Sequence, residues 1–475
     1  MKSYARKGLV LGLIVLLSPL LPGCSKPAKV PSLPPEQKFE EFTSQVNANI
    51  YVDATLSMMG FVRPGADTRY CKTIDALEGS IISGWSHATV NFFKFGDEID
   101  SIKGRDYIRA KQVAFYKNDK INRLTRIQRV IDRIPLADMT LILTDLFQDR
   151  ADVNLLTAQL KENCFQKHLT FGIIGIRSEY NGNIYDLGPS RPTFYHRSSP
   201  GDANTYRPFY IIILGKYPDV VRFYENFKAP EMSGLDFDVT EFVVYSPYLT
   251  KQPVSFNGAT IDSTFYLSEA LNLIPYSTTP DHRLKQFSIQ NDPEKAAFVA
   301  TLPYTPAPYT ISFDHNLIDL EWTVTQCLPD TYFVNPQAKR AFSIAYWQIT
   351  DKGLNIRAEI SPALLPGDGL YLYEIVLRPR INAYKFPAWI SSWDLEKASN
   401  ESGYVLMSML SEDTASVSGA DSVKAVNNFT SVNTKRKAVG TSTLNLQRLL
   451  VDLWKTNVVI HDLYVARLYC YFKKG

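Results

Sequence analysis

Histidine and cysteine are scarce in this chain, which has 475 residues but only six His and five Cys. No two histidines stand at His-x-x-x-His spacing, and no two cysteines form Cys-x-x-Cys. Zinc sites in proteins are commonly built from such spacings of nitrogen and sulfur ligands. We therefore expect no zinc site.

Common catalytic motifs and excess charge are missing as well. The chain has no Gly-x-Ser-x-Gly turn to present a nucleophilic serine and no Gly-x-x-x-x-Gly-Lys loop to bind phosphates. Its 51 Lys and Arg nearly balance its 48 Asp and Glu. Loss of Lys2, Arg6 and Lys7 with a cleaved leader would leave 48 of each. Nothing in this balance argues for nucleic-acid binding.

Residues 1–23 are typical of an export signal. A basic start precedes the apolar run from Gly8 to Leu21, which is too short to span a bilayer comfortably. Leu21-Pro22-Gly23-Cys24 resembles the lipobox of bacterial lipoproteins, in which cleavage precedes a cysteine that receives lipid. The alternative is an ordinary secretory signal with a chance cysteine.

The lipobox resemblance implies a palmitate-type lipid anchor on Cys24 and a place in the bacterial cell envelope. Ser25, rather than Asp, follows Cys24, which favours the outer membrane if the source is Gram-negative. Residues 24–46 contain several prolines and are predicted to form a semi-rigid tether between the lipid and the folded part.

The most informative stretch begins as a buried strand and ends in polar residues. Asp53, Thr55 and Ser57 follow the apolar residues from Ile50 at i, i+2, i+4 spacing. In an irregular loop, this spacing can direct three oxygens to one point, and oxygen ligands suit Mg²⁺, Ca²⁺ or Mn²⁺. The alternative is that Thr55 or Ser57 caps the next helix.

A second buried strand, residues 140–145, also ends in an acid, Asp145. Parallel strands that end at the same edge of a sheet bring the side chains that follow them together. We therefore expect Asp145 and Asp53 to lie near one ion.

Together these segments resemble the von Willebrand factor A (vWA) family and its metal-ion-dependent adhesion site. The family motif Asp-x-Ser-x-Ser, usually followed by Met-x-Gly, corresponds to Asp53–Gly60, with Thr in place of the first Ser. Asp145 corresponds to the family's later aspartate, Thr125 to its intervening threonine, and Leu146 replaces the usual glycine. The resemblance covers roughly residues 47–230 and implies divalent-metal-dependent protein binding.

Strand and helix signals alternate through residues 47–230. They predict a doubly wound, mostly parallel sheet with helices on both faces. The resemblance described above implies that this α/β domain is vWA-like. From residue 231 to 475, short strands with turn signals predict a β-rich, sandwich-like domain. A segment rich in Ser, Thr and Asn near 411–443 is predicted to be a flexible surface loop.

Four cysteines remain besides Cys24, two in each half of the chain. Export permits disulfides, so the natural pairing is 71–164 and 327–470, with buried free thiols as the alternative. The residues concerned are Cys71, Cys164, Cys327 and Cys470.

We expect a lipid-anchored envelope protein that binds a protein partner, rather than an enzyme. A hydrated Mg²⁺ with open positions can accept a partner's carboxylate. One alternative is a metal-dependent phosphoesterase, with Asp53 as phosphoryl acceptor or Thr55 as nucleophile. Another is a structural envelope subunit whose metal site is degenerate.

Overall fold

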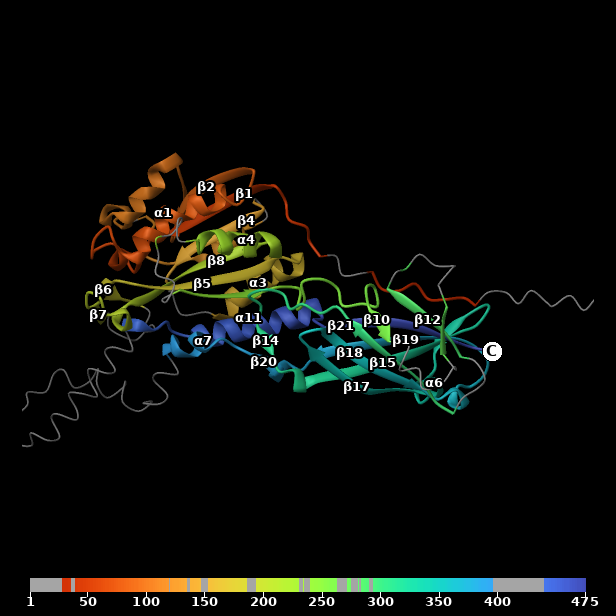
Figure 1. Ribbon diagram of the computed structural model, residues 1–475. Coiled ribbons are helices and arrows are strands. Elements are labelled where there is room, and N and C mark those ends of the chain that lie inside the picture. The colour runs from red at the N-terminus through yellow and green to blue at the C-terminus, as the bar shows by residue number, and fades with distance from the viewer. Residues whose placement is uncertain are drawn as a thin grey trace, which may run out of the picture.

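The computed structural model describes residues 28–35, 39–118, 120–134, 137–146, 153–185, 194–229, 234, 240–262, 271–274, 281, 283–289, 294–395 and 440–475. These residues form an α/β lobe and a β lobe that lie end to end (Figure 1). Cys24 and most of the 411–443 loop lie outside the described residues. No described helix is long and apolar enough to cross a membrane.

The α/β lobe is built on a seven-stranded sheet with the order β3-β2-β1-β4-β8-β5-β9. The central strands are apolar and buried along their whole length, as strands covered on both faces must be. The strands are β1 (Gln45–Asp53), β2 (His87–Phe95), β3 (Ile99–Ile102), β4 (Met139–Thr144), β5 (Thr170–Ser178), β8 (Arg207–Gly215) and β9 (Thr240–Tyr245).

The prediction of a mostly parallel sheet is wrong. β1 runs parallel to β2 and β4, whereas the four other neighbouring pairs in the described sheet are antiparallel. The chain leaves β5 and returns as β8 through the hairpin of β6 (Asn181–Ile184) and β7 (Phe194–Arg197). A crossover helix would have made β8 parallel; a hairpin return makes it antiparallel.

Helices cover both faces of this sheet, as predicted. α1 (Arg69–Ile82) and α4 (Tyr217–Phe227) share one core with Ile50 and Val52 of β1. The other face contributes Tyr51 to a second core, which includes residues of α2 (Ile127–Ile131), α3 (Val153–Asn163) and α11 (Leu446–His461). Successive residues of β1 thus point to opposite cores.

The domain boundary expected at residue 230 is wrong. β9 lies beyond it, and the last helix, α11, runs beneath the sheet of the α/β lobe (Figure 1). The ring of Trp454 packs edge-on against Tyr245, 5.3 Å between centroids, and Asn457 Nδ2 donates to Ser246 O at 2.9 Å. α11 has an apolar stripe that must be buried, and it is buried against the sheet of the α/β lobe.

The β lobe is a two-sheet sandwich, in agreement with the β-rich prediction. Phe298, Ile356, Tyr373 and Phe472 from the two sheets meet in its core. One sheet has the order β10 (Thr260–Asp262), β13 (Ala296–Leu302), β18 (Gly353–Ile360), β17 (Phe342–Thr350). The other has the order β11 (Leu271–Ile274), β12 (Leu284–Ile289), β21 (Ala466–Lys474), β19 (Gly369–Pro379), β15 (Ile318–Cys327), β16 (Tyr332–Val334).

Smaller elements complete the described chain. β14 (Ser312–Phe313) pairs with β20 (Tyr384–Lys385), and the short helices are α6 (Pro336–Lys339) and α7 (Ala388–Ser392).

The four described cysteines are free and buried, so the pairing 71–164 and 327–470 is wrong. Cys71 and Cys164 belong to the cores on opposite faces of the seven-stranded sheet. Cys470 points into the sandwich core, whereas Cys327 points to the outer face of the same sheet. Each sheet separates the two thiols beyond the reach of a disulfide.

The described parts of the predicted tether are packed against the fold. The Phe39 ring stacks on Tyr248 with 4.3 Å between centroids, and the Arg222 guanidinium lies 3.6 Å from the Phe42 ring centroid. Val30 and Leu33 pack against the outer face of the β lobe. The described residues 28–35 and 39–46 therefore do not form a tether that stands clear of the folded part, because their apolar side chains pack against it.

Candidate metal centre

The two predicted carboxylates come together at the carboxyl ends of β1 and β4. Asp53 is the last residue of β1, and Asp145 directly follows β4. The two strands are parallel neighbours, with Val52 opposite Leu143, so the residues that follow leave the sheet at one edge. The sequence prediction for this pair depended on parallel pairing of these two strands, and that pairing is present.

Three hydroxyl groups gather in front of Asp53. The side chain of Thr55 donates to Asp53 Oδ1 at 2.6 Å, and its backbone N–H donates to the same oxygen at 3.0 Å. Thr55 Oγ1 also lies 3.1 Å from Ser57 Oγ and 3.1 Å from Thr125 Oγ1. The structure therefore brings Thr125 to the motif from 70 residues away.

The helix-capping alternative for this stretch is wrong. Ser57 stands at the N-cap of the 3-10 helix η1 (Met58–Phe61), but its side chain makes no capping hydrogen bond. Its hydroxyl is directed to Thr55. The side chains of these polar residues therefore contact each other instead of capping the start of a helix.

The oxygen cluster fits a small divalent cation. Neighbouring ligands around octahedral Mg²⁺ lie about 3 Å apart, because each is about 2.1 Å from the ion. The two hydroxyl contacts of Thr55, each 3.1 Å, match that separation. No group of three or more His, Cys, Asp or Glu that could hold a metal occurs among the described residues. An ion held at this cluster would therefore take hydroxyl oxygens among its ligands.

Burial gives Asp53 an unusual protonation equilibrium. Removal from water, followed by repulsion from Asp145, raises the pKa of Asp53 to about 7. Hydrogen bonds from Thr55 and Thr144 oppose this rise; Thr144 Oγ1 donates to Asp53 Oδ2 at 2.8 Å. Near neutral pH, a proton and a metal ion would therefore compete for this site.

Arg207 is a member of the site that sequence reasoning missed. Its Nη2 lies 3.8 Å from Asp145 Oδ2, and both side chains are fully buried. The Tyr180 ring covers the guanidinium, 5.5 Å from the ring centroid. Arg207 begins β8, and a parallel β8 would have placed it at the opposite edge of the sheet.

Leu146 has a backbone conformation that favours glycine. Its φ is 59°, in the left-handed region that side chains other than glycine rarely occupy. Its N–H donates to Thr144 Oγ1 at 3.2 Å, and its side chain is buried in the core shared with α3. The loop after Asp145 therefore has a glycine-like backbone despite the leucine.

The base of the β6–β7 hairpin covers the motif. Tyr180 Oη lies 3.1 Å from Ser57 O and 2.6 Å from Asn183 O. A Cβ on Gly60 would lie 2.3 Å from the Tyr180 ring, so only glycine permits this approach. The five predicted site residues are consequently buried beneath the chain.

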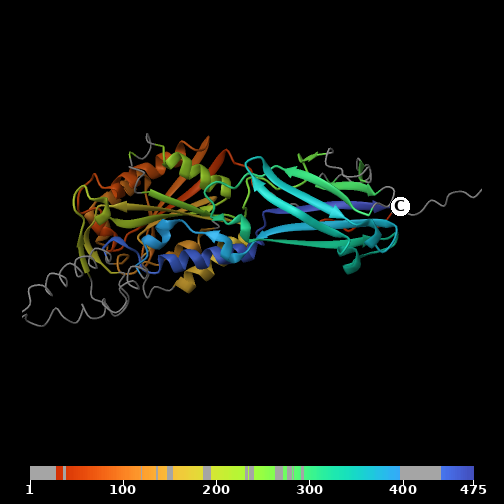
Figure 2. The same ribbon diagram turned by 60° about the horizontal axis from the view of Figure 1, so that its bottom comes forward.

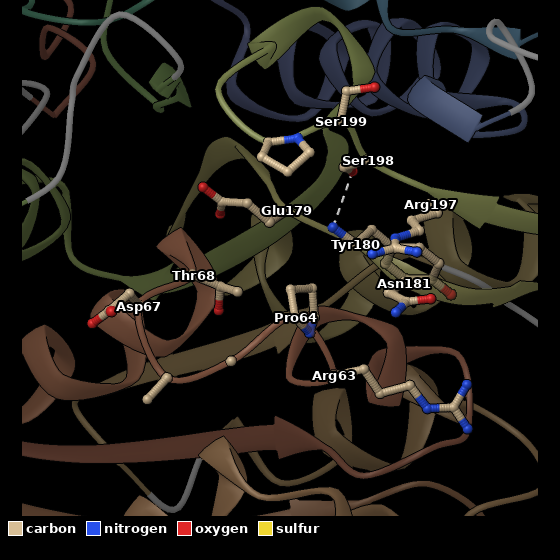
Figure 3. Close-up of a pocket in the computed structure, with 13 residues that line it drawn as sticks. Arg63, Pro64, Asp67, Thr68, Glu179, Tyr180, Asn181, Arg197, Ser198 and Ser199 are labelled. Carbon is tan, nitrogen blue, oxygen red and sulfur yellow. Dashed lines mark hydrogen bonds between the residues drawn. The ribbon is translucent and has the colours of Figure 1, made fainter.

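A cavity of about 380 Å³ is lined in part by Tyr180 (Figure 3). Arg63 and Arg197 line it, as does Glu179, whose carboxylate pairs with Arg69 Nη1 at 2.8 Å. With Glu179 neutralised in this way, the two arginines outnumber the remaining acid in the lining, Asp67. The cavity is therefore suited to an acidic ligand.

No protein-family model matches the chain, and no curated protein or solved structure matches it significantly.

Proposed function

We propose that this chain is a lipid-anchored cell-envelope protein whose vWA-like α/β lobe binds a divalent cation and, through it, a carboxylate of a protein partner. The observation that carries the proposal is the convergence of three hydroxyls and two carboxylates from three separate segments. Thr55, Ser57 and Thr125 would hold the ion, with Asp53 and Asp145 supplying negative charge. The ion would supply a Lewis acid that binds the partner's oxygen.

The charges of the site support recognition of an acid. With both acids ionised, Asp53, Asp145 and Arg207 leave the buried site with one net negative charge. A bound Mg²⁺ would convert this to one net positive charge, which a single carboxylate neutralises. Protonation of Asp53 neutralises the metal-free site instead. The site is thus electrically balanced either with a proton or with both a metal and an anion.

The neighbouring cavity gives the same partner a second contact. Tyr180 covers the motif, so it would have to move aside for an acidic segment to reach the ion. That segment would then lie beside Arg63 and Arg197, which line the cavity together with Tyr180 (Figure 3). We therefore propose that the partner presents clustered acidic residues rather than one carboxylate alone.

Titration calorimetry with MgCl₂, CaCl₂ and MnCl₂ tests the metal site, using residues 24–475 with Cys24→Ser to keep the chain soluble. Thr125→Val should abolish the heat of binding, because it removes one hydroxyl ligand while preserving shape. Thr140→Val is the matched control, since Thr140 is equally buried in β4 but lies outside the cluster. Binding that survives Thr125→Val would refute the proposed ligand set.

The degenerate-site alternative has one specific observation in its favour, the buried Arg207. Its guanidinium already supplies positive charge to Asp145, so a structural subunit could do without metal. Absence of heat with all three ions, in wild type and in Arg207→Gln, would establish this alternative. A phosphoesterase would instead hydrolyse a generic phosphoester and lose that activity with Thr55→Val.

A further inference from the structure

Residues 28–35, here called the strap, are bound along the outer face of the β lobe. Lys29 N donates to Leu328 O at 2.8 Å at one end, and Arg283 Nη1 donates to Pro34 O at 2.8 Å at the other. Between these bonds, Val30 and Leu33 pack on an apolar cluster that includes Tyr471. The strap therefore crosses the six-stranded sheet from the β15–β16 turn to the start of β12.

The strap begins at the end of the β lobe where exposed apolar side chains gather. The β15–β16 turn, the β18–β19 loop and the C-terminus meet there, because Lys474 Nζ donates to Pro362 O at 3.0 Å. Edge strand β16 exposes three consecutive apolar residues, and Lys29 lies 5.9 Å over the Tyr332 ring. We call this end the tip; its exposed members are Lys29, Tyr332, Phe333, Val334, Leu364 and Lys473.

The tip and the candidate metal centre lie at opposite ends of the molecule. The β6–β7 hairpin that covers the metal centre is at the left of Figure 1, and the C-terminus is at the right. The same end-to-end arrangement is visible after the rotation in Figure 2. Because β1 runs away from the β lobe, its carboxyl end is directed toward the far end of the long axis.

The docked strap shortens the connection to the lipid. Four residue steps separate Cys24 from Ala28, and they can span at most about 14 Å. A free tether from residue 24 to 46 could instead span about 80 Å. A lipid on Cys24 therefore holds the tip, and no other part of the fold, against the bilayer.

We propose that the tip rests on the membrane and that the strap fixes the molecule upright, with its metal centre directed away from the lipid. This inference rests on the lipid anchoring proposed above. Tyr and other aromatic side chains favour the bilayer interface, and basic side chains favour anionic headgroups. Among the described residues in and beside the tip, six basic side chains outnumber three acidic ones: Lys29, Lys295, Lys339, Arg340, Lys473 and Lys474 against Glu294, Asp330 and Asp368.

Energy transfer to the membrane tests the orientation. Residues 24–475 are coupled through Cys24 to maleimide lipid in phosphatidylethanolamine–phosphatidylglycerol vesicles that contain an acceptor dye; the other four cysteines are buried. A donor dye is attached by oxime chemistry to a ketone amino acid at Leu364 or at Tyr195, which are 56% and 57% exposed. Transfer from position 364 should exceed that from 195 several-fold.

Two double variants test the contributions of the strap and of the tip to the orientation separately. Val30→Asp with Leu33→Asp should release the strap and reduce the difference between the two dye positions. Phe333→Ser with Val334→Ser should lower transfer from 364, whereas the control Val459→Ser should not, although Val459 is 71% exposed on α11. The melting temperature of each variant verifies that it is folded.

Equal transfer from positions 364 and 195 in the wild type, or an unchanged difference after strap release, would overturn the proposal. Because the coupling is chemical, this result does not depend on lipidation in cells. Fatty-acid labelling of the wild type and of Cys24→Ser tests that lipidation separately.

Discussion

The buried carboxyl of Asp53 links the candidate metal centre to pH. Its pKa is about 7 in the folded state, above the ordinary value of 3.8, chiefly because it is removed from water. Between these values, the folded chain keeps a proton that the unfolded chain has lost. The contribution of Asp53 to stability is therefore fully present below pH 3.8 and is lost as pH rises through 7.

This linkage predicts a pH-dependent response to magnesium. Mg²⁺ must displace the proton from Asp53 at low pH, so it should raise the melting temperature little at pH 5.5 and more at pH 8. At a hundred times the dissociation constant, binding stabilises the fold by about 2.7 kcal/mol. Thermal unfolding with and without Mg²⁺ at both pH values is the measurement, with Asp53→Asn as the control that should not respond. An equal shift at both pH values would contradict the prediction.

At Leu146 the loop imposes a left-handed backbone conformation that leucine rarely adopts. The left-handed conformation costs a side-chain-bearing residue about 1–2 kcal/mol relative to glycine. The leucine is nevertheless accommodated, because its side chain is buried in the core that includes Leu156 and Leu160.

An alanine variant is usually more stable than a glycine variant at the same position, and at Leu146 we expect the opposite. Leu146→Ala and Leu146→Gly both lose the buried side chain, but only glycine relieves the backbone. We expect Leu146→Gly to be the more stable of the two by about 1 kcal/mol. At Leu156, inside α3, glycine should instead be the less stable by a similar amount. Urea unfolding of the four variants measures both differences, and the same order at both positions would disprove the role of φ.

At the scale of elements, the direction of β8 and the position of α11 decide what the α/β lobe contains. The hairpin return into β8 places Arg207 beside Asp145. α11 covers the face that presents Tyr210 and Tyr245, more than 200 residues after those strands. Neither element could be assigned to its place from local pattern, because each is positioned by a distant surface.

Removal of α11 should therefore expose the sheet. We expect residues 39–246 alone to aggregate or to bind the dye ANS, because the core that Trp454 and Leu450 complete is open to water. The same fragment joined by a Gly/Ser linker to residues 440–463 should be soluble and unfold cooperatively. Size-exclusion chromatography and ANS fluorescence distinguish the two. Cooperative folding of the shorter fragment would show that α11 is dispensable.

At the scale of the whole molecule, neither lobe is built from a single continuous stretch of the chain. The chain enters along the β lobe as the strap, builds most of the α/β lobe, builds most of the β lobe, and returns to each with α11 and β21. This path places the strap and the tip at one end of the molecule and the candidate metal centre at the other (Figure 1). If the proposed lipid anchor and partner binding hold, this arrangement would present the metal centre at a distance from the membrane.

The sequence by itself determined the features that depend on local chemistry. The apolar runs before Asp53 and Asp145 specified buried strands, and the i, i+2, i+4 oxygens specified a polar loop. Alternating strand and helix signals specified a sheet with helices on both faces. Each of these features follows from residues that are close in the sequence, so it could be predicted without knowing which distant segments pack against it.

Only the tertiary structure decided the rest. The free thiols, the antiparallel β8 with Arg207, the docked strap and the return of α11 all depend on contacts between residues far apart in the chain. Cys327 and Cys470 show the reason, because they lie only two strands apart and yet face opposite sides of one sheet. Which face a residue presents, and what covers it, is set by strand direction and register, which the local sequence does not encode.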